Sequence, residues 1–238
     1  MNDTGSSAHL LGEDGPFASA LPGFAPRQAQ IEMAQVVERT LSSGESLVAE
    51  AGTGIGKTLA YLVPALLSGK RIIVSTGTKT LQDQLFFRDL PLVREALGLS
   101  VRPALLKGRS NYLCLHRMQM ARTDGRLPSR EAVTELEGVL DWSARTVDGD
   151  LSISGGISED SGLLPFVTST TENCLGAECS EFDGCFVAKA RREAQEADVV
   201  VVNHHLLFAD MAIKQRGFGE VLPGASAFII DEAHLAPE

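Results

Sequence analysis

Four cysteines are the residues whose spacing points most directly to chemistry. They follow the pattern Cys114-x59-Cys174-x4-Cys179-x5-Cys185 and are all the cysteines of the 238-residue chain. Four thiolates suit either a [4Fe–4S] cluster or a tetrahedral zinc ion. Structural zinc usually shows closely spaced cysteine pairs, so the isolated first cysteine leans weakly towards iron. Zinc and unliganded buried thiols remain the alternatives.

A glycine-rich segment, "AGTGIGKT", lies between an apolar run and a helical pattern. Glycines let the backbone turn tightly so that its N–H groups face a phosphate, and the next helix adds its positive end. Lys57 would reach the β and γ phosphates of ATP, and Thr58 would bind Mg²⁺. The alternative is a glycine-rich turn without a ligand. The candidate ATP-binding residues are Ala51 (where the pattern has its first glycine), Gly52, Thr53, Gly54, Ile55, Gly56, Lys57 and Thr58.

An acidic pair follows a second apolar run in "FIIDEAHL", residues 228–235. Ligands bind at the carboxyl ends of strands in open α/β sheets. Asp231 would hold Mg²⁺ through water, and Glu232 would orient and deprotonate the attacking water. His234 is placed to sense the nucleotide or to couple it to nucleic acid. An ordinary acidic turn is the alternative; with the glycine-rich segment upstream, ATP hydrolysis by Lys57, Asp231 and Glu232 is favoured.

Alternating strand and helix patterns must position these residues. Apolar runs predict buried strands at 46–50, 71–75, 198–202 and 227–230. Helical spacing predicts helices at 27–41, 57–67 (perturbed near Pro64) and 79–90. This alternation predicts an α/β fold with a parallel sheet.

The chain divides into three predicted regions. Residues 1–20 are rich in Gly, Ser and acid and predict a flexible tail. Residues 21–106 and 196–238 form the predicted ATP-binding sheet domain. Residues 107–195 hold all four cysteines, a predicted helix at 130–144 and a Gly/Ser/Asp-rich segment at 148–162, and are interpreted as an insertion.

Composition limits the function classes. The net charge of −10 and the pI of about 5.0 exclude a generally basic protein that coats nucleic acid. The sequence shows neither a signal peptide nor an apolar run long enough for a membrane span, which predicts a cytoplasmic protein with no membrane partner. Disulfides are unexpected there.

Six segments together resemble the XPD/DinG-like iron–sulfur superfamily 2 DNA helicases, with the bacterial DinG and YoaA branch as the nearest match. In order along the chain they are "PGFAPRQAQIEM", "AGTGIGKT", "VSTGTKTLQDQL", "LLKGRSNYLC" with the cysteine cluster, "DVVVVNHHLL" and "DEAH". The first is similar to the adenine-reading Q motif, which would make Gln30 the adenine reader with Arg27 beside it. The third is similar to motif Ia, which grips single-stranded DNA.

This resemblance implies a RecA-like first motor domain with an inserted iron–sulfur domain, and ATP, Mg²⁺ and a [4Fe–4S] cluster as cofactors. It implies ATP-driven 5′-to-3′ unwinding of DNA in repair or replication, on single-stranded and forked DNA. Because the sequence stops soon after "DEAH", we expect the required second RecA-like domain to be missing. The 238 residues alone should then bind ATP and DNA weakly, as a monomer, without unwinding.

Candidate DNA contacts come from the motif Ia segment and from basic residues near the cysteines. A solvated helix face is the alternative for the arginines, packing against the cluster for Tyr112, and helix capping for Thr78. Asn203 and His204 are interpreted as polar residues at the ligand edge of the sheet. The candidate DNA-binding residues are Thr76, Thr78, Lys79, Lys107, Arg109, Tyr112, Lys189 and Arg192.

Two other functions compete with a DNA helicase. One is a metal-stapled nucleic-acid-binding module in which the phosphate loop is vestigial. The other is a DEAH-type RNA helicase, which would not require the four cysteines.

Overall fold

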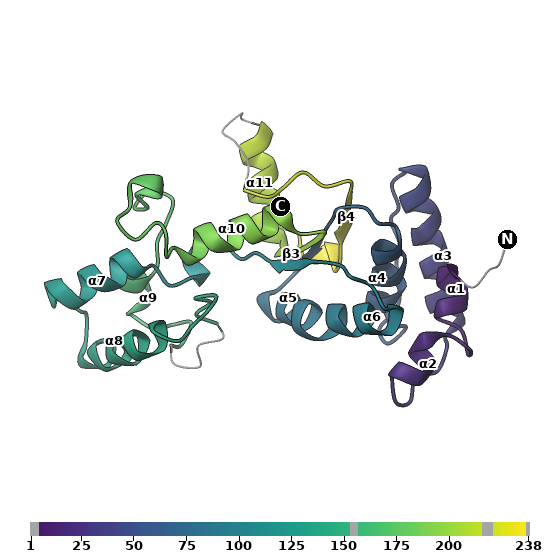
Figure 1. Ribbon diagram of the computed structural model, residues 1–238, viewed down its shortest axis with the longest axis horizontal. Coiled ribbons are helices and arrows are strands. Elements are labelled where there is room, and N and C mark those ends of the chain that lie inside the picture. Colours follow the sequence, from purple (N-terminus) through teal and green to yellow (C-terminus); the bar gives the residue numbers. More distant parts are fainter. Residues whose placement is uncertain (1–4, 153–156, 216–220, 237–238) are drawn as a thin grey trace. The chain divides into compact units, whose positions relative to one another are not determined.

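The computed structural model describes residues 5–152, 157–215 and 221–236 (Figure 1). Two compact units make up the chain. We call Met1–Leu105 with Glu196–Glu238 the sheet unit, and Leu106–Gln195 the cysteine unit.

The sheet unit contains a parallel sheet of four strands in the order β2-β3-β1-β4. The two central strands are runs of β-branched residues buried along nearly their whole length, as expected for a sheet covered on both faces. The predicted α/β fold with a parallel sheet is confirmed. The strands are β1 (Ile72–Thr76), β2 (Pro103–Leu105), β3 (Val199–Asn203) and β4 (Ala227–Ile230).

Five longer helices accompany this sheet. Helix α3 packs against α4, while α5 and α11 contact both central strands (Figure 1). The predicted helices at 27–41, 57–67 and 79–90 are confirmed; Pro64 lies inside α4 without ending it, and a π-helical turn, Leu85–Asp89, continues α5. The helices are α3 (Gln28–Ser43), α4 (Lys57–Leu67), α5 (Lys79–Gln84), α6 (Leu90–Leu97) and α11 (His204–Gln215).

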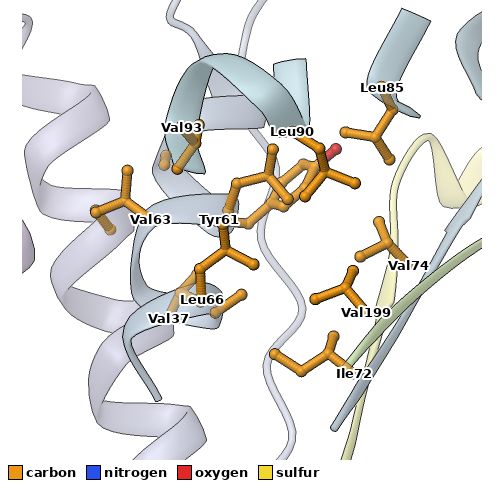
Figure 2. Close-up of a cluster of buried hydrophobic side chains, with 14 of the residues drawn as sticks. Val37, Tyr61, Val63, Leu66, Ile72, Val74, Leu85, Leu90, Val93 and Val199 are labelled. Carbon is orange, nitrogen blue, oxygen red and sulfur yellow. The ribbon is translucent and has the colours of Figure 1, made fainter. Parts of the chain in front are cut away.

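The core of the sheet unit lies between α4 and one face of the sheet. Figure 2 shows Tyr61 and Leu66 of α4 on the side towards Ile72 and Val74 of β1, with Val63 on the other side, near Val93 of α6. Because side chains alternate along a strand, Ser75 points to the opposite face.

The N-terminal segment differs from the predicted flexible tail. Its described residues form α1 (Ser7–Leu10) and α2 (Pro16–Ala20), and Leu11 and Phe17 are completely buried. The Ser7 amide donates to Glu38 Oε2 of α3, 3.1 Å away. A few well-spaced apolar side chains are enough to dock the segment on the rest of the sheet unit. The overall composition of the segment, which is rich in Gly, Ser and acidic residues, does not reveal this.

Two strand assignments also differ. Residues 46–50 were predicted to form a strand but have no regular structure, and Val48 is fully exposed. An apolar run becomes a strand only when it has a partner, and β4, at the sheet edge, pairs with β1 alone. Strand β2 was not predicted because it has only three residues, beginning with Pro103.

The cysteine unit is mostly helical. It contains α7 (Leu115–Asp124), α8 (Arg130–Ser143), α9 (Leu164–Val167) and α10 (Phe186–Glu196), with 3₁₀ turns at Arg109–Asn111 and Gly176–Glu178. Helix α8 confirms the prediction at 130–144. Residues 153–156 of the Gly/Ser/Asp-rich segment lie outside the described residues. Across the described ranges, no helix is long and apolar enough to cross a bilayer.

Candidate active site

The glycine-rich segment forms an irregular loop that leads directly into α4 at Lys57. Gly54 and Gly56 have φ angles of 82° and 84°, in the left-handed region that favours glycine. A Cβ on Gly56 would also lie 2.1 Å from Gln30 Nε2. The loop therefore needs glycine at this position, and it delivers the chain to a helix N-terminus, where anions bind favourably.

Lys57 and Glu232 face each other across this site. Lys57 Nζ lies 3.1 Å from Glu232 Oε1 and 3.4 Å from the carbonyl oxygen of Ala51. Both side chains are little more than a quarter exposed. The fold thus brings together the Lys57 ammonium and the Glu232 carboxylate, both predicted to act on ATP, from distant parts of the sequence.

Asp231 is held by a tyrosine that the motifs did not identify. The Tyr61 hydroxyl donates to Asp231 Oδ2 at 3.0 Å. Burial, and then the charge of Asp231, raises the pKa of Tyr61, so the phenol keeps its proton. Tyr61 therefore holds Asp231, one of the two predicted magnesium ligands. Its position one helical turn after Lys57, on the same face of α4, is the signal that could have found it.

Glu232 has an unusual backbone. With φ 54° and ψ 48° it is the only non-glycine residue of the described ranges with positive φ. Its amide donates to Asp231 Oδ1 at 3.0 Å, and its carbonyl accepts from the Leu235 amide at 2.8 Å. The turn η5 (Ala233–Leu235) follows, and exposed His234 has its Nδ1 3.5 Å from Glu232 Oε2.

A cleft of about 730 Å³ opens beside these groups. Cavities of this volume are large enough for a small-molecule cofactor. It reaches from Lys57, Tyr61, Asp231, Glu232 and His234 past Ala51 to residues 44–50 and β4.

The DEAD/DEAH box helicase family matches residues 30–123, which include the glycine-rich loop and α4. The chain carries a DEAD/DEAH box helicase domain. Its homologues include the ATP-dependent DNA helicase YoaA of Escherichia coli, 53% identical over 226 residues, covering 94% of this chain and 35% of that protein. The ATP-dependent helicase DinG of Mycobacterium tuberculosis is 40% identical over 241 residues, covering 92% and 35%. The 3′-5′ exonuclease DinG of Bacillus subtilis is 31% identical over 239 residues, covering 94% and 24%.

The chain therefore spans about a third of the length of the first curated relatives it matches.

The segment of this helicase domain that is predicted to read adenine contacts the glycine-rich loop instead. Gln30 is 2% exposed, and its Nε2 donates to the Gly56 carbonyl at 3.0 Å. Exposed Arg27 donates through Nη1 to the Gly54 carbonyl. Gln30 thus braces the loop from behind, since burial leaves no face for a base.

The predicted DNA contacts of the sheet unit separate into buried and exposed residues. Thr76 is 1% exposed and its Oγ1 donates to the Thr78 carbonyl, so burial removes it from the DNA-contact set. The Thr78 side chain caps α5 by accepting from the Leu81 amide at 3.2 Å, as the capping alternative predicted. Lys79 is exposed.

In the cysteine unit, two predicted DNA contacts are buried. Lys107 is 2% exposed and pairs with Asp150, with 2.7 Å between Nζ and Oδ2; the Tyr112 hydroxyl accepts from the Lys107 amide at 3.0 Å. Tyr112 is 4% exposed and cannot stack on a base. Lys189 is half-buried and donates to the Val147 carbonyl, while Arg192 is exposed.

The four cysteines are all free and partly buried. Burial raises the pKa of the Cys114 thiol, with smaller contributions from Cys185 and Cys179. Cys174 instead accepts from Arg109 Nη1 at 2.8 Å. Within the described residues, no three His, Cys, Asp or Glu side chains are grouped to hold a metal ion. The donor chemistry fits a cluster, and the cluster itself stays a prediction.

Proposed function

We propose that this chain is the ATP-binding part of a DNA helicase that couples ATP hydrolysis to 5′-to-3′ movement on single-stranded DNA and to duplex unwinding. The observation that carries the proposal is the meeting of Lys57, Asp231 and Glu232 beside one cleft. The printed names of YoaA and DinG support an ATP-dependent DNA helicase. A role in DNA repair or replication in the cytoplasm, as a monomer, belongs to the same proposal.

Each residue of the site has a part in this chemistry. Residues 51–56 would enclose the phosphates of ATP and Lys57 would neutralise their charge. Thr58 and Asp231 would hold Mg²⁺, which supplies further charge neutralisation when bound. Glu232 would take the proton of the attacking water. His234 would contact the nucleotide.

We propose further that Cys114, Cys174, Cys179 and Cys185 hold a [4Fe–4S] cluster that staples the cysteine unit. Iron, acid-labile sulfide and zinc content of anaerobically purified protein tests this directly. About four irons and four sulfides per chain are expected, one for each corner of the cluster. One zinc without sulfide would point to the nucleic-acid-binding module instead.

Fewer of the candidate DNA-binding residues are accessible than the sequence predicts. Lys79 and Arg192 are exposed, with Thr78, Lys189 and Arg109 as further candidates. Contacts of this kind bind phosphates, so affinity for single-stranded or forked DNA should fall steeply with salt.

The deciding experiment is Lys57→Ala in the full-length protein, with Glu232→Gln as a matched charge-neutral variant. Both should lose ATP turnover while DNA binding is kept; Glu232→Gln should still bind ATP. Unchanged activities in Lys57→Ala would favour a binding module with a vestigial loop. Unwinding of RNA but not DNA duplexes would favour an RNA helicase.

A further inference from the structure

His204 is a buried polar residue that the proposed chemistry does not use. It is the first residue of α11 and has no exposed surface. Its Nδ1 lies 2.7 Å from Ser75 Oγ and its Nε2 lies 3.3 Å from the Glu232 carbonyl oxygen. A carbonyl oxygen only accepts hydrogen bonds, so Nε2 carries a hydrogen. In the neutral ring, Nδ1 then accepts from the Ser75 hydroxyl.

The elements around His204 fix the place of its ring. β1 and β3 pair with Ser75 opposite Val202 and Thr76 opposite Asn203, which brings Ser75 next to the start of α11. Asn203 Oδ1 accepts from the Leu206 amide at 2.9 Å and so anchors the first turn of that helix. The Phe208 ring lies edge-on to the imidazole, with 6.3 Å between ring centroids.

The partner of this ring is the strained residue of the site. Left-handed backbone is unfavourable for a non-glycine residue and persists only where the surroundings hold it. The Glu232 carbonyl is held from two sides, by the Leu235 amide and by His204. If Glu232 left the left-handed region, its Cα–Cβ bond would turn relative to the backbone and the carboxylate would move away from Lys57.

We propose that His204 is a positioning residue for ATP hydrolysis: by donating to the Glu232 carbonyl, it keeps the carboxylate in the orientation needed to take a proton from water. The inference rests on the proposed function, because it assigns Glu232 that role. His204 itself touches neither ATP nor the water. Ser75 fixes the ring tautomer that makes the donation possible.

Kinetics of ATP hydrolysis by the full-length protein test this. His204→Phe removes the donor, and kcat should fall about tenfold to a hundredfold, as for a small misplacement of a catalytic group. The KM for ATP should stay within about twofold, because the phosphate loop is untouched. His204→Gln, whose amide can donate to the same carbonyl, should recover much of kcat. Ser75→Ala should lower kcat less than His204→Phe.

Two controls keep the outcomes distinct. His205→Phe is the same substitution at the exposed neighbouring histidine and should leave kcat unchanged. Wild-type kcat in both His204→Phe and Ser75→Ala, while Lys57→Ala is inactive, would overturn the inference and leave the proposed function standing. Equal loss in His204→Gln and His204→Phe, with a lower melting temperature in both, would reduce His204 to a core residue. Full turnover in Lys57→Ala would overturn both proposals.

Discussion

Tyr61 shows how a single residue can serve the core and the site together. Its ring is packed in the core of the sheet unit (Figure 2). Its hydroxyl donates to Asp231 Oδ2 at 3.0 Å. The raised pKa of Tyr61 means that the group beside Asp231 is a neutral donor rather than a second anion. A phenol can therefore stabilise the Asp231 carboxylate without competing for a cation.

Replacing Tyr61 with Phe removes this donor and leaves Asp231 Oδ2 without its tyrosine partner. Because hydrogen bonds to charged groups contribute more than neutral ones, the free energy of unfolding of the sheet unit should fall by about 1.5–3 kcal/mol. Chemical denaturation measures the change. Tyr112→Phe, which removes the hydroxyl of the other tyrosine, should leave the sheet unit unaffected. Equal stability of Tyr61→Phe and wild type would contradict the prediction.

At the scale of elements, the cysteine unit contains a buried ion pair between Lys107 and Asp150. The stretch around Tyr112 runs antiparallel to the stretch around Asp150, joined by an isolated bridge and by the Leu113–Gly149 and Leu151–Asn111 backbone hydrogen bonds. Lys107 closes this arrangement through Asp150 and Ser152. A buried charge of this kind is costly once its partner is removed.

Lys107→Met should therefore destabilise the cysteine unit by about 3–5 kcal/mol, since Asp150 is left as a buried, unpaired carboxylate. Trp142 of α8 is the single tryptophan, so its fluorescence during urea unfolding reports this unit. The double variant Lys107→Met/Asp150→Leu should regain most of the loss.

Lys189→Met is the matched control in the same unit. Its ion pair with Glu193 is on the surface, and such pairs contribute about 0–1 kcal/mol. If Lys107→Met and Lys189→Met lowered the free energy of unfolding by the same amount, the buried ion pair of Lys107 would contribute no more than a surface ion pair.

For the whole molecule, the sequence predicts the sheet unit better than the details of its site. The runs at β1 and β3 predict buried strands because nearly every residue in them is apolar, and the glycine-rich loop predicts the start of α4. The sequence assigns Gln30, Lys107 and Tyr112 to ligands, because a polar residue type in a motif does not reveal that its side chain is buried. The sequence also predicts a strand at residues 46–50, because an apolar run does not reveal whether a distant segment is available to pair with it.

The chain's two tyrosines lie one in each unit and make an alkaline titration informative. Burial raises the pKa of Tyr61 and of Tyr112 above the ordinary value of about 10. A raised folded-state pKa gives stability that is complete below about pH 10 and lost as pH rises beyond it.

Near-ultraviolet tyrosinate absorbance should therefore be absent from the native chain just above pH ~10 and appear only with unfolding, whereas the urea-unfolded chain ionises at that pH. In Tyr112→Phe, Tyr61 is the only tyrosine, so the appearance of tyrosinate absorbance then reports unfolding of the sheet unit. Tyrosinate in the native chain at pH ~10 would show that one of the rings is accessible to hydroxide.

The open edge of β4 has a practical consequence for handling the protein. Phe228 and Ile230 are 53% and 42% exposed on a strand that is paired on one side only. Unprotected apolar edges act as templates on which other chains add strands, and natural proteins suppress this with charge. The chain should therefore precipitate as its concentration rises, and a lysine in place of Phe228 should act as a gatekeeper that raises solubility.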